Sequence, residues 1–130
     1  MSSSTLKVFS NQMYNLCNTL HNRFPENKQI SLSLTGIETL KNSNSKKLFE
    51  IFLKHGYKYR DKVMNKDEAF MLDTNLLEEE HKSTDNENIM NTLKSQWKSL
   101  DSEEKEHIWK YLQVLMKLSD KYLSENLKSN

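Results

Sequence analysis

The sequence predicts an all-α protein, a single compact bundle of five or six helices with a long C-terminal helix at its centre. Apolar residues recur at steps of three and four in several segments, which places them on one helix face. Capping boxes mark helix starts at Thr84 with Glu87 and at Asp101 with Glu104. Only one short segment alternates like a strand, and that strand would have no partner. The 130 residues suit one helical domain spanning residues 1–130.

The first expected helix runs from about Thr5 to Arg23, and Pro25 ends it. The second segment, residues 30–40, fits either a short strand or a helix. We favour the helix because a lone strand cannot form a sheet, although Gly36 costs about 1 kcal/mol in a helix.

A loop with capping residues is expected at 42–45, followed by a dense apolar helix that ends near Gly56. Residues 57–72 are charged and are predicted to be partly helical. Residues 73–85 are predicted to form a polar, acidic loop.

The last helix has the widest apolar stripe, which is typical of a helix that is packed on two sides, so we place it at the centre of the bundle. Apolar residues from all the well-defined stripes should form the core. The expected core residues are Leu6, Phe9, Met13, Leu16, Leu20, Phe49, Phe52, Trp97, Ile108, Leu112, Leu115 and Leu118.

The composition indicates the cellular compartment in which the protein acts. Cys17 is the only cysteine, so no intrachain disulfide can form, which fits a reducing environment. No segment has the apolar run of a signal peptide or a membrane span. We therefore expect an intracellular protein, in cytoplasm or nucleus, that does not engage a membrane.

The net charge of +1 hides a strong segregation of charge. Residues 41–66 carry a net charge of +6, and residues 67–87 carry −7. The candidate partner-binding or nucleic-acid-binding residues in the basic segment are Lys54, Lys58, Tyr59, Arg60, Lys62 and Lys66. The candidate acidic partner surface comprises Glu78, Glu79 and Glu80.

These charges favour a non-enzymatic protein-interaction or structural protein that binds a protein partner or self-associates through its basic and acidic surfaces. The alternative is a nucleic-acid-associated protein that uses the basic segment 41–66, since lysines bind phosphates and tyrosines stack on bases. Two simpler interpretations stay open. The charges could form a solvated face, or they could pair within one molecule.

No pattern of catalytic, metal-binding or cofactor-binding residues is found, and no small-molecule substrate is evident. Consecutive side chains such as Glu78–Glu80 and His81 point in different directions, which is unsuitable for a metal site. A small enzyme that uses Cys17 or a histidine is a third hypothesis, but a cysteine beside an apolar stripe is usually a core residue.

Two segments resemble parts of small uncharacterised proteins of large nucleocytoplasmic DNA viruses. They are residues 57–70 (YKYRDKVMNKDEAF) and residues 108–119, which begin IWKYLQVL. The abundance of Lys and Asn, which have A/T-rich codons, agrees with this similarity. The resemblance implies a viral protein that acts in the host cell or is packaged in the virion, and it implies no particular activity.

Overall fold

The computed structural model of the chain describes residues 2–73 and 89–128. Within these residues every regular element is helical and no strand occurs, so the all-α prediction is confirmed. The elements are α1 (Ser2–Arg23), α2 (Lys28–Ser43), α3 (Ser45–His55), the 3₁₀ helix η1 (Tyr57–Tyr59), α4 (Arg60–Met64), α5 (Glu68–Leu72), α6 (Ile89–Gln96), the 3₁₀ helix η4 (Trp97–Ser99) and α7 (Ser102–Lys128).

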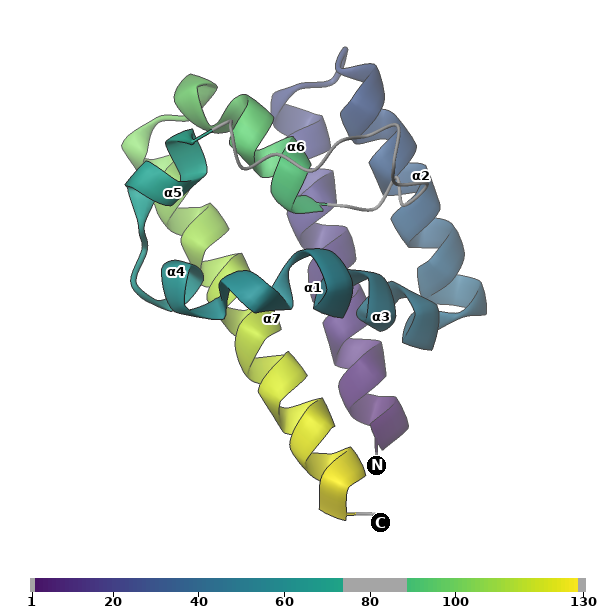
Figure 1. Cartoon of the computed structure of the whole chain (residues 1–130). Coiled ribbons are helices and arrows are strands. Elements are labelled where there is room, and N and C mark those ends of the chain that lie inside the picture. Colours follow the sequence, from purple (N-terminus) through teal and green to yellow (C-terminus); the bar gives the residue numbers. More distant parts are fainter. Residues whose placement is uncertain (1, 74–88, 129–130) are drawn as a thin grey trace.

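The two longest helices, α1 and α7, run antiparallel, and their free ends lie at the same end of the molecule (Figure 1). Helix α1 packs against α2, α3 and α7, whereas α7 packs mainly against α1 and α4. The prediction that α7 lies at the centre of the bundle therefore needs correction. Its wide apolar stripe packs mainly against α1 and α4, and Trp109 and Tyr122 also contact η4 and α3, while its outer face is exposed to solvent. Helix α1 has the more central place because it packs closely against three long helices.

Helix α1 begins at Ser2, earlier than expected, and ends at Arg23 just before Pro25. The hydroxyl of Thr5 does not cap this helix. It donates a 2.8 Å hydrogen bond to Oε1 of Glu125 near the end of α7. At the other end of the pair, Arg23 donates to Glu104 at 2.6 Å. These two contacts hold the antiparallel helices in register.

The segment that fits either a strand or a helix is helical, as predicted, and forms α2. The predicted loop at 42–45 is shorter than expected, because the helical backbone continues to Ser43. Asn44 separates the two helices: its backbone N–H donates to the carbonyl of Leu40 at 2.7 Å, and its side chain accepts from the N–H of Lys47 at 3.1 Å. One residue thus ends α2 and caps α3.

The prediction of five or six helices is too low, because seven α-helices lie within the described residues. The difference arises after Gly56, where the charged segment divides into η1, α4 and α5. Lys66 lies between the last two with a φ of 51°, in the left-handed region that commonly ends helices. Asp67 then caps α5 by accepting from the N–H of Phe70 at 3.1 Å.

The expected core residues are all buried, with Leu118 partly so. Four aromatic rings pack edge to face near the crossing of α1, α3 and α7, with Phe9 on Phe49 and Phe52, and Phe49 on Tyr122. Trp97 packs in the same way against Trp109, with ring centroids 5.1 Å apart.

The predicted start of α7 is confirmed by a reciprocal capping box. The N–H of Asp101 donates to Glu104 at 2.9 Å, and the N–H of Glu104 donates to Asp101 at 2.8 Å. The other predicted capping box, Thr84 with Glu87, and all but the first residue of the predicted 73–85 loop lie outside the described residues. None of the helices described is long and apolar enough to cross a membrane.

Candidate functional site

The predicted basic site is held against the rest of the molecule chiefly through Arg60. Its guanidinium binds both carboxylate oxygens of Asp120 on α7, with Nη2 2.7 Å from Oδ2 and Nε 3.0 Å from the same oxygen. The hydroxyl of Tyr57 donates to Oδ1 of Asp120 at 2.5 Å. The hydrogen bonds from Arg60 hold the pKa of Asp120 below its usual range, and the bond to Asp120 raises the pKa of Tyr57.

Two more of the candidate cations pair with acids of the same chain. Lys62 lies 3.5 Å from the carboxylate of Asp67, and Lys66 binds Glu106 on α7. The bond from Lys66 lowers the pKa of Glu106. Internal pairing, one of the simpler interpretations of the charge pattern, therefore accounts for Arg60, Lys62 and Lys66.

The remaining candidates of the basic segment lie beside this network. Tyr59 packs its ring against Phe70, with centroids 4.7 Å apart, so one face of the ring is already covered. The ammonium of Lys58 lies 5.3 Å from the centroid of the Tyr59 ring. Lys54 is exposed in the last turn of α3. The structure thus places Lys54 and Lys58 at the surface and uses Tyr59 in packing.

The predicted acidic surface, Glu78, Glu79 and Glu80, lies outside the described residues. The charge balance is nevertheless informative. The described residues carry 18 Lys and Arg against 13 Asp and Glu, which gives a net charge of +5, whereas the sequence of residues 74–88 has −4. The helices that the structure describes are therefore distinctly cationic, although the chain as a whole is nearly neutral.

Cys17 is fully buried between α1 and α2, where its thiol faces the carbonyl of Ile30 at 3.9 Å. Burial raises the pKa of this thiol to about 12, so it is a protonated core residue and is unsuited to nucleophilic attack. In the part of the chain that the structure describes, no group of three or more His, Cys, Asp or Glu side chains is placed to hold a metal ion.

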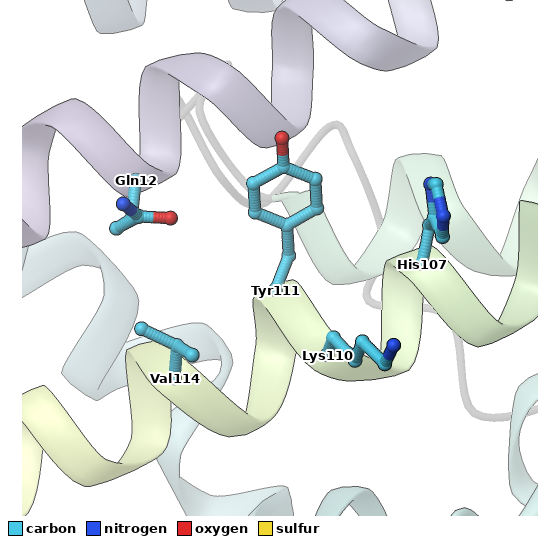
Figure 2. Close-up of a pocket in the computed structure, with 5 residues that line it drawn as sticks. All are labelled: Gln12, His107, Lys110, Tyr111 and Val114. Carbon is cyan, nitrogen blue, oxygen red and sulfur yellow. The ribbon is translucent and has the colours of Figure 1, made fainter.

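A groove between α1 and α7 is a hollow lined by residues that the structure describes. It has a volume of about 290 Å³ and is lined by Gln12 of α1 and by four residues of α7: His107, Lys110, Tyr111 and Val114. Figure 2 shows that Tyr111 points from α7 toward α1 and that Gln12 extends from α1 beside it. Val114 is 40% exposed, and Val8, one turn from Gln12, is 46% exposed. The groove therefore exposes the apolar side chain of Val114 among mostly polar lining residues.

The outer face of α7 adds a row of cations to this groove, which we call the α7 stripe. Lys110, Lys117 and Lys121 are all exposed and flank Val114 at helical spacing. None of these three lysines lies within 4.0 Å of a described carboxylate. Lys110, one turn from Glu106, nevertheless helps to lower the pKa of that carboxyl, which Lys66 binds. Helix α1 contains no acidic residue, and α7 contains none between Glu106 and Asp120.

Sequence reasoning missed this surface because it concentrated on the basic block at 41–66. A signal was present, since the polar face of the last helix between Glu106 and Asp120 contains two lysines around one valine and no acid, and Lys121 follows. The sequence alone does not show that this face is a possible binding surface. The packing of α1 on α7 shows it, because it places Tyr111 and Val114 beside a second helix that has no acidic residue.

Lys94 is a second feature that the sequence did not suggest. This lysine of α6 is buried, and its ammonium binds the carbonyl of Phe70, lies 3.3 Å from the carbonyl of Asp73 and lies 3.6 Å from the centroid of the Phe70 ring. Burial lowers its pKa. The cation binds carbonyls at the end of α5, which is a structural role.

No protein-family model, curated protein or solved structure matches the chain. The resemblance of residues 57–70 and 108–119 to viral proteins stays a prediction.

Proposed function

We propose that this chain is a non-enzymatic protein-interaction protein and that it binds an acidic protein partner in the groove between α1 and α7. The observation that carries this proposal is the α7 stripe, with Lys110, Lys117 and Lys121 around the exposed Val114. An exposed apolar surface rimmed by polar residues marks an interaction site when it is contiguous, as at Val114 and Tyr111 beside the hollow, and a surface of one sign attracts a partner of the other.

Self-association through this groove is disfavoured by the same charges. If two copies met face to face along α7, their lysines would approach one another, because the stripe between Glu106 and Asp120 has no acid. Like charges across an interface oppose association. The groove therefore suits a different protein better than a second copy.

Nucleic-acid binding through the basic segment is the competing function. The structure lowers its support, because Arg60, Lys62 and Lys66 pair with acids of the chain, and Tyr59 has one ring face against Phe70. Phosphate binding by those groups would compete with the ion pairs already present.

A photo-crosslinking experiment tests the proposal. p-Benzoylphenylalanine replaces Val114 in the full chain, and the protein is irradiated in a nuclease-treated extract of the cells in which it occurs. The same residue in place of Leu32, which is 58% exposed on α2, serves as the positional control. We expect a discrete protein adduct from position 114 and none of the same mass from position 32.

Charge-reversal variants make the result specific. Lys110→Glu with Lys117→Glu should abolish the adduct, while Lys46→Glu with Lys47→Glu, which reverses two exposed charges on α3, should preserve it. Equal adducts from positions 114 and 32, no discrete adduct, or an adduct with the mass of two copies would each contradict the proposal. A parallel irradiation in extract without nuclease treatment is the comparison, and an adduct that forms only there would contradict the proposal and favour the nucleic-acid alternative.

A further inference from the structure

Resting on the proposed function, we further infer that the partner presents an amphipathic helix, which lies along the α1–α7 groove with an apolar side chain against Val114 and Tyr111 and with carboxylates toward Lys110, Lys117 and Lys121. The inference names the class of ligand, which the proposed function leaves open. Three features of the surface carry it: its spacing, its apolar hollow and its charge.

The spacing of the surface matches a helix. Positions 107, 110, 114, 117 and 121 follow one another at steps of three and four along α7, and α1 runs antiparallel beside them (Figure 1). A seam with this period pairs with another helix of the same period, because apolar side chains of the incoming helix recur at the same intervals. An extended peptide repeats every two residues and would match only some of these positions.

The hollow supplies an anchor point in the first half of the seam. Tyr111, Gln12 and Val114 are among the residues that line it (Figure 2). Val8 on α1 extends the apolar surface by one turn beyond Gln12. A hollow of about 290 Å³ suits the insertion of a bulky apolar side chain, the usual anchor when a helix binds in a groove.

The charges around the hollow select an acidic ligand. Lys110 lies at the hollow itself, and Lys117 and Lys121 follow two and three turns beyond Lys110 along the exposed face of α7. The carboxylates of α7 that lie next to the three lysines are Glu106 and Asp120, and they pair with Lys66 and Arg60. An incoming glutamate therefore meets the cations Lys110, Lys117 and Lys121, whereas an incoming lysine meets repulsion.

The test uses two fluorescein-labelled, capped 18-residue peptides and the full chain. In one peptide leucines recur at steps of three and four and glutamates fill the flanking positions; in the other, lysines replace the glutamates. Binding is measured by fluorescence anisotropy at 50 mM and 300 mM salt. We expect the acidic peptide to bind at least tenfold more tightly than the basic one, with a preference that shrinks at high salt.

Matched variants locate the site. Val114→Glu and the pair Lys110→Glu with Lys117→Glu should each weaken the acidic peptide about tenfold, and the lysine pair should gain affinity for the basic peptide. Leu32→Glu and the pair Lys46→Glu with Lys47→Glu are the matched controls and should change neither affinity. Circular dichroism of each variant checks that the helices are intact.

Equal binding of both peptides, or an equal loss in the control variants, would overturn the inference. Failure of the inference is separable from failure of the proposed function. If a protein adduct forms at position 114 but the acidic peptide does not compete with it, the function stands and the acidic helix is wrong. If no adduct forms, the proposed function itself fails.

Discussion

Replacing Asp120 by Ala should destabilise the protein by about 2 kcal/mol. The carboxylate accepts one hydrogen bond from Tyr57 at 2.5 Å and paired hydrogen bonds from Arg60. A hydrogen bond to a charged group contributes roughly 1.5–3 kcal/mol, and an exposed ion pair contributes about 0–1 kcal/mol. Because the side chains of Arg60 and Asp120 are 38% and 35% exposed, we take the lower part of the combined range.

Urea unfolding followed by circular dichroism measures this effect, and the melting temperature should fall by about 6 °C. Tyr57→Phe alone should cost about 1 kcal/mol. In the Asp120→Ala background it should cost almost nothing, because the acceptor is already absent, so the double-mutant cycle should show coupling. A loss below 0.5 kcal/mol for Asp120→Ala, or additive effects of the two changes, would refute our view that Asp120 ties η1 and α4 to α7.

The contact between Arg60 and Asp120 also makes the free energy of unfolding depend on pH. Hydrogen bonds from Arg60 lower the pKa of Asp120 in the folded protein, so the unfolded chain binds this proton more tightly. The contribution of Asp120 is therefore complete above the ordinary carboxyl pKa of 3.8 and is lost as the pH falls through the lowered value. The stability difference between the wild type and Asp120→Ala should shrink in that acidic range.

Two further predictions concern buried groups. Burial lowers the pKa of Lys94 in the folded protein. The wild type should therefore gain stability relative to Lys94→Met as the pH rises from the lowered pKa toward the ordinary value of 10.5. If urea unfolding shows a stability difference that does not vary with pH, Lys94 is not a buried cation. Cys17, with its pKa raised from 9.0 to about 12, should have a thiolate fraction about a thousandfold below that of an ordinary thiol at neutral pH and should react with a thiol reagent only slowly. Rapid labelling of the folded protein, comparable with labelling in 6 M guanidinium, would show that the thiol is accessible.

Most of the helical architecture could be predicted from the sequence because its signals are local. The three-and-four spacing of Leu6, Phe9 and Met13 defines the buried side of α1 without reference to any other segment. Asp101 and Glu104 lie three residues apart and form hydrogen bonds within one helical turn, so their capping role can also be recognised from the sequence. The short breaks around Lys66 were harder to predict, because a left-handed non-glycine residue gives no strong compositional signal.

The candidate site was less predictable, since it depends on contacts between distant segments. Arg60 and Asp120 are 60 positions apart, and Lys66 and Glu106 are 40 apart, so no local pattern shows that the basic block is paired. The groove likewise exists only where Gln12 and Tyr111 face each other across α1 and α7.

The helices, the apolar side of each helix and the charge of each segment therefore follow from local sequence, because spacing and capping act within a few residues. Which charges neutralise one another, and which remain at the surface, depends on how the helices pack. That choice follows from packing: burying the apolar stripes brings α4 against α7 and α1 against α7, which places Asp120 beside Arg60 and leaves Lys110, Lys117 and Lys121 around an open groove.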